Sequence, residues 1–251
     1  MSMHSTPGVT ELPDDFDGQV RLFPLPGLVL FPHAMQPLHV FEPRYVEMLR
    51  ESLASDHLIA MATLTGNGEQ AAVTEPSIHP TVCIGKVISH AELENDRHNI
   101  LLVGMRRASI RRELDAGRPF RMAQIDLIDD FYLPSGTPKR GGLKKRLLQA
   151  FGKIIPPTTG SQKSLHNLMQ GQMGVGPITD IIAYTLPFPA QAKLRLLAMS
   201  DVDARAEALI ELIEAGVIEL NTVNEEDADQ PWNSSASSSG PDQFPPPFSV
   251  N

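Results

Sequence analysis

The sequence is poor in the residues and runs that would place it in several common classes of protein. Its 251 residues include one cysteine, which excludes an intramolecular disulfide. No hydrophobic run approaches the roughly 20 residues that span a bilayer, and the first residues lack the basic start and apolar segment of a signal peptide. No Gly-x-x-x-x-Gly-Lys-Ser/Thr motif occurs, so we expect no ATPase site. These absences predict a cytoplasmic protein without a membrane span.

Basic residues are missing from both ends of the chain. The first 19 residues hold four acidic side chains and the last 28 hold five, and these nine equal the whole net charge of −9. The part between them is neutral, whereas nucleic-acid binding depends on clustered positive charge. Because Ser-, Pro- and acid-rich segments bury too little apolar surface to fold, we expect disorder over residues 1–17 and 224–251.

Three isolated aromatic residues, Trp232, Phe244 and Phe248, lie in the acidic C-terminal segment. They leave two interpretations open: a short docking motif, or an inert tail that happens to contain aromatic residues. The inert tail is the favoured interpretation.

The composition between the two ends changes once, which predicts an α+β fold of two parts. Residues 18–133 are rich in strand patterns, and residues 141–220 predict a helical subdomain after a Pro/Gly-rich hinge. The predicted strands are 20–25, 35–41, 57–64, 81–90, 100–112 and 120–130. The predicted helices of the second part are 143–155, 164–173, 178–186, 190–199 and 201–215.

Two helix starts carry local signals. Glu42 and Pro43 suit the first turn of a helix that interrupts the strands, since a carboxylate complements the positive helix end and proline needs no hydrogen-bond acceptor there. Ser200, three residues before Asp203, has the spacing of a capping box for the last helix, and Gly216 is placed to end that helix.

The run from Leu22 to Leu53 resembles the N-terminal domain of the Lon ATP-dependent proteases. The resemblance rests on Phe-Pro-Leu at 23–25, Val-Leu-Phe-Pro at 29–32 and Pro-Leu-His-Val-Phe-Glu-Pro-Arg-Tyr at 37–45. A second block, 82–110, with Gly85, Gly104 and Arg107, and a weaker third block, 179–212, with Arg205, extend it over about residues 18–220.

The resemblance implies a PUA-like β pseudo-barrel of about six strands with one inserted helix, followed by a C-terminal helical bundle. It implies a non-catalytic module that binds unfolded or extended protein segments, as an adaptor or regulator in protein quality control or proteolysis, with a Lon-type protease or a chaperone as a possible partner. No Ser-Lys peptidase motif accompanies it, so we expect no enzymatic activity, and we expect no metal or cofactor. An RNA-binding PUA-like module is the alternative.

The hydrophobic loop before the second strand is the candidate binding surface. Proline lacks the backbone N–H that sheet hydrogen bonds need, so this loop is not expected to be a regular strand. It is also too apolar for a free loop. It therefore either packs on the barrel or forms a groove between the barrel and the helical part. Packing is favoured, and the candidate binding residues are Leu28, Val29, Leu30, Phe31 and Met35.

The remaining signature residues are expected to be structural. Arg44 is expected to bridge its helix to the barrel, and His39 to be a hydrogen-bonded core residue. Cys83 is expected to be a buried strand residue, because reactivity needs an exposed, electropositive setting. The other residues of this group are Pro32, Phe41, Glu42, Pro43 and Tyr45.

One dense set of basic residues would serve the RNA-binding alternative. No aromatic side chains are interleaved with it to stack on bases, so an ordinary solvated surface is the favoured interpretation. The set consists of Arg106, Arg107, Arg111, Arg112, Lys139, Arg140, Lys144, Lys145 and Arg146.

Overall fold

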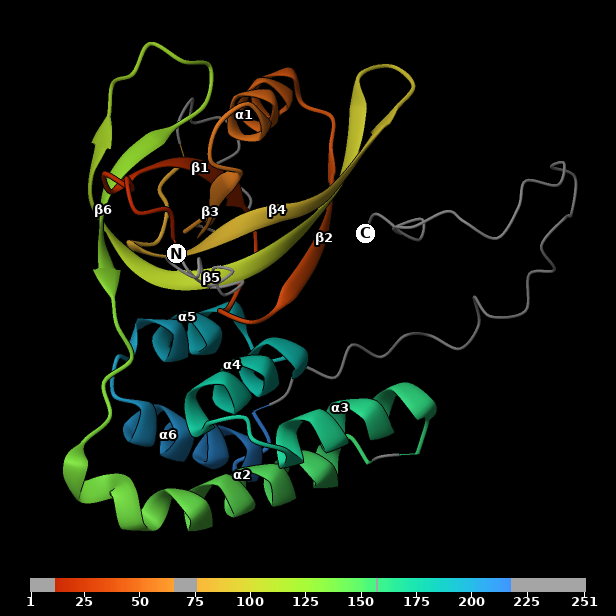
Figure 1. Cartoon of the computed structure of the whole chain (residues 1–251), viewed down its shortest axis with the longest axis vertical. Coiled ribbons are helices and arrows are strands. Elements are labelled where there is room, and N and C mark those ends of the chain that lie inside the picture. The colour runs from red at the N-terminus through yellow and green to blue at the C-terminus, as the bar shows by residue number, and fades with distance from the viewer. Residues whose placement is uncertain (1–11, 66–75, 157, 218–251) are drawn as a thin grey trace, which may run out of the picture.

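The computed structural model describes residues 12–65, 76–156 and 158–217, and the two predicted disordered ends lie largely outside these ranges. A β-sheet with one helix forms the first half of the chain, and helices form the second half (Figure 1). None of the described helices combines the length and the apolar character needed to cross a membrane.

All six predicted strands and the inserted helix are present. The helix α1 (Pro43–Leu53) separates the second strand from the third, and Pro43 occupies its first turn as predicted, with Glu42 as the N-cap residue. The strands are β1 (Gln19–Leu25), β2 (Met35–Val40), β3 (Leu58–Thr63), β4 (Thr81–Leu93), β5 (Arg97–Leu114) and β6 (Met122–Ile128).

Five of the six strands close into a barrel, and the sixth, β2, lies outside it. The order of the sheet is β2-β5-β4-β3-β1-β6, and β6 pairs back onto β5, so five strands form a barrel. The first half of β5 pairs with β2 and its second half with β6. β2 is therefore an edge strand, and the β4–β5 hairpin beside it projects beyond the barrel (Figure 1).

The loop between β1 and β2 crosses the barrel wall at Gly104. The Phe31 carbonyl lies so close that a Cβ atom on Gly104 would be 2.0 Å from its oxygen. Two backbone hydrogen bonds fix the crossing: His33 N donates to Gly104 O at 2.8 Å, and Gly104 N donates to Ala34 O at 2.9 Å. Glycine is required here by the close approach of two backbones.

In the described part of the chain, five helices follow β6 and a short 3₁₀ segment, η2 (Pro134–Lys139). The last helix is capped by Asp201, whose side chain accepts from Ala204 N at 3.0 Å, so the prediction of Ser200 as its N-cap was wrong by one residue. Gly216 follows that helix with a φ of +66°, as predicted. The helices are α2 (Arg140–Ile154), α3 (Gly160–Gln170), α4 (Val175–Thr185), α5 (Ala190–Ala198) and α6 (Val202–Glu214).

The helical half and the barrel half share one hydrophobic core. Phe31 and Leu102 of the barrel half belong to the same buried cluster as Ile178 and Leu196 of the helical half. A smaller cluster, which includes Leu22, fills the barrel itself. The division into separate subdomains at residues 133 and 141 therefore remains a prediction.

Candidate functional site

Most of the hydrophobic loop belongs to the core. Val29, Leu30 and Phe31 are between 0 and 5% exposed, and Leu28 is partly buried against the core cluster. Only Met35, at 59% exposure, opens to solvent. This placement agrees with the favoured prediction that the loop packs on the barrel. The exposed apolar surface begins at Met35 and continues along β2 and the strands β5 and β4.

Strand pairing places several apolar side chains on the same face as Met35. Residues directly opposite each other in antiparallel strands have side chains on one face. Pro37 lies opposite Leu101, which lies opposite Ser89, and His39 lies opposite Asn99. We call this surface the β2 face. It consists of Met35, Pro37 and His39 of β2, Phe41 just after β2, Arg97, Asn99, Leu101 and Val103 of β5, and Ser89, Ala91 and Leu93 of β4.

The outer part of the β2 face is open and carries exposed apolar side chains beside one charged residue, Arg97. Phe41 is 57% exposed, and its ring lies 5.7 Å from that of His39. Leu93 is 38% exposed at the hairpin end, and Ile88, in an irregular step of β4 beside this face, is 49% exposed. The opposite face of the same strands is buried, as Leu38 shows. Exposed apolar side chains grouped in this way are typical of interaction sites.

Two signature residues lie differently from their prediction. Arg44 does not bridge to the barrel. It pairs with Glu42, its neighbour at the helix start, at 2.8 Å, and both side chains are nearly half exposed. The Arg44 guanidinium also covers the ring of Tyr45, which is buried against Phe23. His39 is hydrogen-bonded as predicted, with Nδ1 2.8 Å from Asn99 Oδ1, but it is only partly buried.

Among the other residues expected to be structural, Phe41 is 57% exposed, which does not fit that expectation, whereas Pro32 and Cys83 are buried. Pro32 is buried beside the Gly104 crossing. Cys83 is fully buried in β4, and its burial raises the pKa of the thiol far above the ordinary value. A buried, protonated thiol has little nucleophilic character.

A buried ion network joins the barrel to the helices. Arg107 of β5 pairs with Asp130 at 3.0 Å and with Asp180 of α4, and Arg205 of α6 contacts both Asp130 carboxylate oxygens at 3.0 Å. Arg205 also donates to the Met199 carbonyl at 2.6 Å. Arg107, Arg205 and Asp180 are at most 3% exposed. The junction therefore combines this charged network with a shared hydrophobic core, and an apolar binding groove between the barrel and the helical part stays a prediction.

Gly176 and His33 adjoin this network. A Cβ atom on Gly176 would lie 2.6 Å from Tyr132 Oη and 2.7 Å from Asp130 Oδ2, so glycine lets the connector after β6 approach α4. His33 lines a cavity of about 440 Å³ together with Arg107 and Asp130. Burial, followed by the positive charge of Arg107, lowers the pKa of the His33 imidazole.

The network predicts a pH dependence of stability. Burial raises the pKa of Asp180 to about 6, from an ordinary value of 3.8, although Arg107 and Arg205 favour its charged form. Between these values the folded state holds a proton that the unfolded chain has released, so this contribution to the free energy of unfolding grows as the pH falls. Relative to Asp180→Asn, the wild type should gain about 1–2 kcal/mol between pH 7 and pH 5.

Urea unfolding of both proteins at the two pH values measures this change. The exposed replacement Asp126→Asn is the matched control, because it removes a carboxylate that lies outside the buried network. Parallel pH dependences for wild type and Asp180→Asn would contradict the raised pKa.

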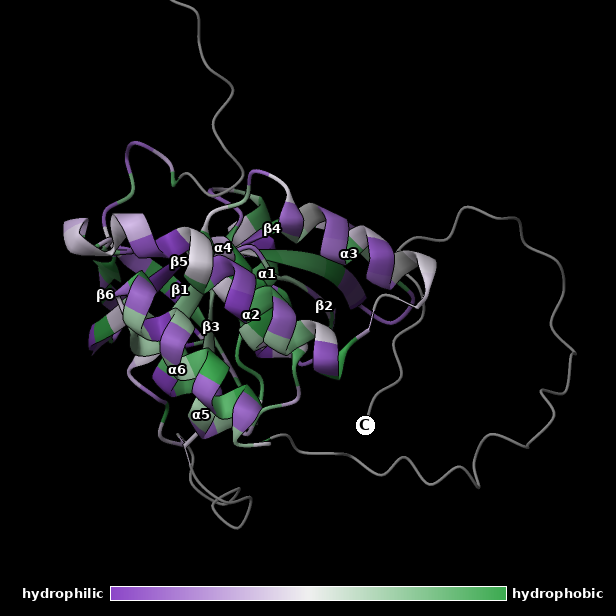
Figure 2. Ribbon diagram, turned by 90° about the horizontal axis from the view of Figure 1, so that it is seen from below, coloured by the Kyte–Doolittle hydropathy of each residue, from purple (hydrophilic) through white to green (hydrophobic). Residues whose placement is uncertain are grey.

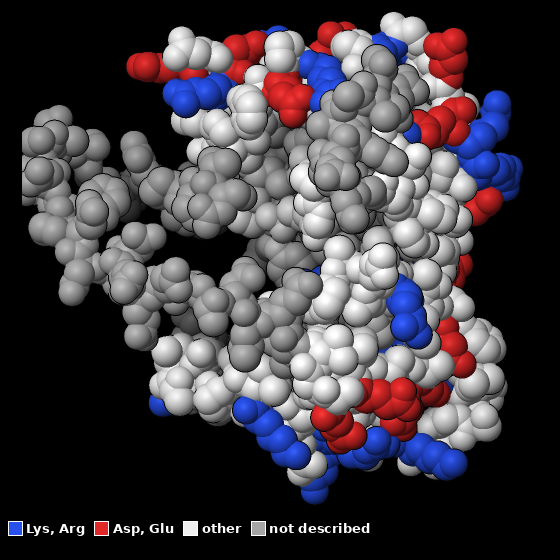
Figure 3. All heavy atoms as spheres, turned by 180° about the vertical axis from the view of Figure 1, so that it is seen from behind, with Lys and Arg blue, Asp and Glu red and all other residues white. Residues whose placement is uncertain are grey.

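Most of the basic set is paired with acidic residues or backbone carbonyls. Arg106 pairs with Asp129, Arg111 with Asp126 and Arg140 with Asp203. Arg146 pairs with Glu207 at 2.9 Å, and Lys144 donates to the carbonyls of Gly171 and Met173. On the face shown in Figure 3, basic and acidic side chains are interspersed. Among the described residues, no three potential ligands are grouped to hold a metal ion.

A mixed six-stranded sheet with a helical C-terminal part is the fold of Lon N-terminal domains. The Lon N-terminal domain protein from Xanthomonas campestris matches 77% of this chain and 97% of its own, with a TM-score of 0.54 and 19% identity. The N-terminal domain of Lon protease from the Mycobacterium avium complex matches 78% of this chain and 98% of its own, with a TM-score of 0.61 and 14% identity.

Sequence comparison gives the family. Residues 19–215 match the ATP-dependent protease La (LON) substrate-binding domain, and the chain belongs to this family. It is 24% identical to Lon protease of Chloroherpeton thalassium over 88% of the chain, and 25% identical to Lon protease 1 of Bacillus subtilis over 82% of the chain. The chain spans about a quarter of the length of these relatives, since the match covers 26% of each.

The sequence reading missed part of this site. Leu93, Leu101 and Ile88 were assigned to strands or hairpins but not to a surface, because alternation shows that a strand has two faces without showing which face is covered. Arg205 is marked in the sequence only by its match to the family, and Arg107 by that match and by its place in the basic set. Nothing in the sequence indicates that the two side chains meet.

Proposed function

We propose that the protein binds extended or unfolded segments of other proteins at the β2 face, without catalysing a reaction on them. Membership of the LON substrate-binding domain family supports the binding of protein substrates. The observation that carries the proposal is the exposure of Met35 and Phe41, 59% and 57%, on an edge strand of the sheet. We place this activity in the cytoplasm, as an adaptor or regulator of proteolysis.

The geometry suits an extended ligand. Peptide recognition by strand addition combines backbone bonds to an edge strand with pockets for alternate side chains. On the open edge of β2, Tyr184 Oη already donates to Met35 O at 3.0 Å and Pro37 has no N–H, so backbone pairing with a ligand is left to the end of β2 at His39. Residues 35, 37, 39 and 41 recur with the period of a strand, and of these Met35 and Phe41 are exposed while Pro37 and His39 are partly buried. An apolar segment added beside β2 would place alternate side chains on the β2 face.

The charges of the protein support a protein ligand over RNA. Three arginines of the basic set are neutralised by ion pairs with aspartates: Arg106 with Asp129, Arg111 with Asp126 and Arg140 with Asp203. Salt-dependent binding of nucleic acid requires unpaired positive charges that displace counterions.

Replacing Phe41 by serine tests the proposal directly. Loss of one aromatic anchor costs more than about 1 kcal/mol at an interface, so we expect binding about tenfold weaker. The measurement is fluorescence anisotropy of labelled peptides from unfolded proteins, titrated with the full chain, together with a labelled RNA oligomer. Met35→Ser should act in the same direction.

The matched control is Ile154→Ser, since Ile154 is also an exposed apolar residue, at 39%, but lies at the end of α2. It should bind peptide as the wild type does. Equal losses for Ile154→Ser and Phe41→Ser, or unchanged binding by Phe41→Ser, would count against the β2 face. Saturable RNA binding that disappears with salt would favour the alternative function.

A further inference from the structure

A second apolar surface lies between α5 and α6 and shares no residue with the β2 face. Figure 2 shows hydrophobic residues on both helices where they meet. The pocket between them has a volume of about 290 Å³. Because small-ligand pockets run from about 300 to 1,000 Å³, this volume suits one large side chain rather than a whole ligand.

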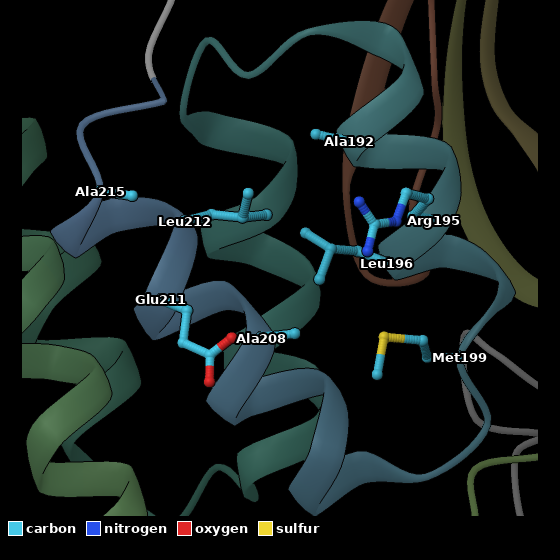
Figure 4. Close-up of a pocket in the computed structure, with 8 residues that line it drawn as sticks. All are labelled: Ala192, Arg195, Leu196, Met199, Ala208, Glu211, Leu212 and Ala215. Atoms are coloured by element: carbon cyan, nitrogen blue, oxygen red, sulfur yellow. The ribbon is translucent and has the colours of Figure 1, made fainter.

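The walls and the rim of this pocket differ in chemistry (Figure 4). Leu196 and Met199 on the α5 side and Leu212 on the α6 side form apolar walls. Arg195 and Glu211 extend from the two helices toward the space between them. Within the described parts of the chain neither is in an ion pair, so both charges are available to a group that enters the pocket.

Ala192 and Ala208 also line the pocket, and their small side chains leave room that larger residues would fill. Among aromatic side chains, tryptophan fits the combination of walls and rim best. Its indole N–H is a donor that the Glu211 carboxylate can accept, and its ring can stack with the Arg195 guanidinium. Phenylalanine offers no donor.

The chain itself carries one tryptophan close to this pocket in sequence. Ala215 lines the pocket, and the described chain ends two residues later at Val217. Trp232 follows 15 residues after Val217, a separation that spans at most about 50 Å. A site linked to its ligand by a short segment sees an effective concentration in the millimolar range. The segment is also acidic, and Asp229, three residues before Trp232, offers a carboxylate of the charge that the Arg195 guanidinium binds.

We propose that Trp232 inserts its indole ring into the pocket between α5 and α6, and so ties the acidic C-terminal segment to the helical part of the same chain. The inference does not depend on the proposed function, because it concerns a different surface and an occupant from within the chain. Of the two interpretations of the C-terminal segment, a docking motif or an inert tail, this proposal adopts the docking motif for Trp232. With a millimolar effective concentration, a dissociation constant near 0.1 mM would give a docked-to-free ratio of about ten.

Tryptophan fluorescence of the full-length protein tests this placement without a label, because Trp232 is the sole tryptophan. In the native protein we expect emission at shorter wavelength than in urea and a several-fold smaller quenching constant with acrylamide. Both quantities should be independent of protein concentration, because the occupant belongs to the same chain. Emission and quenching equal to those of the unfolded chain would overturn the proposal.

Two variants locate the indole. Ala208→Phe fills the pocket and should move the emission of Trp232 to the unfolded position, while Ala204→Phe, at an exposed position of the same helix, should leave it unchanged. Glu211→Ala should raise the quenching constant, and Glu214→Ala, also exposed on α6, should not. Circular dichroism checks that each variant is folded. A protected tryptophan that does not respond to Ala208→Phe or Glu211→Ala would place the indole elsewhere and overturn the proposal.

Discussion

Gly104→Ala is expected to lower the free energy of unfolding by more than about 4 kcal/mol, or to prevent folding. The added Cβ atom would lie 2.0 Å from the Phe31 oxygen and 2.7 Å from its carbonyl carbon. Both are backbone atoms, so no side-chain rotation relieves the overlap. Phe31 is fully buried, and the loop is tied to Gly104 by hydrogen bonds on both sides, so it cannot withdraw without losing them.

Urea unfolding followed by circular dichroism measures the effect, with Gly141→Ala as the matched control. A Cβ atom on Gly141 meets nothing within 4 Å, and this residue lies in α2, where alanine is favoured over glycine by up to about 1 kcal/mol. The control should therefore be neutral or stabilising. A folded Gly104→Ala protein with the stability of the wild type would contradict the close approach of the loop.

The regular elements of this fold could be predicted because their signals are local. Each strand of the barrel combines a short apolar or alternating pattern with turn residues, and α1 has proline in its first turn. The boundaries were less predictable. The predicted strands 81–90 and 100–112 leave a long loop between them, but β4 and β5 continue to a three-residue turn, 94–96, in which Asn95 and Asp96 have φ values of +60° and +57°. This backbone matches the twist of a hairpin.

The candidate sites could be predicted only in part because they depend on contacts between distant residues. The loop 28–31 has no periodicity, so its burial was decided by what packs on it rather than by its own pattern. Met35 is exposed because β2 stays outside the closed barrel, which follows from the order of the strands. Arg107 and Asp180 are 73 residues apart in the sequence, and only the docking of α4 onto the barrel brings them together.

Arg205→Ala is the second large effect that we expect. Arg205 is fully buried and neutralises Asp130, with Asp180 3.5 Å from its Nε atom. Removing one partner of a buried ion pair leaves an uncompensated charge and costs about 3–5 kcal/mol. For a domain of this size, the melting temperature should fall by about 10 °C. Arg111→Ala, which removes an exposed partner of Asp126, should change it little.

A second replacement separates the charge from the packing of the Arg205 side chain. Asp130→Asn in the Arg205→Ala background removes the charge that Arg205 neutralised and leaves Arg107 with Asp180 as a balanced pair. If the loss comes from an uncompensated buried charge, the double variant should be more stable than Arg205→Ala alone, although Asp130→Asn by itself should destabilise the wild type. Additive losses in this double-mutant cycle would instead assign the effect to the packing of Arg205, and the ion network would not be what holds the helical part on the barrel.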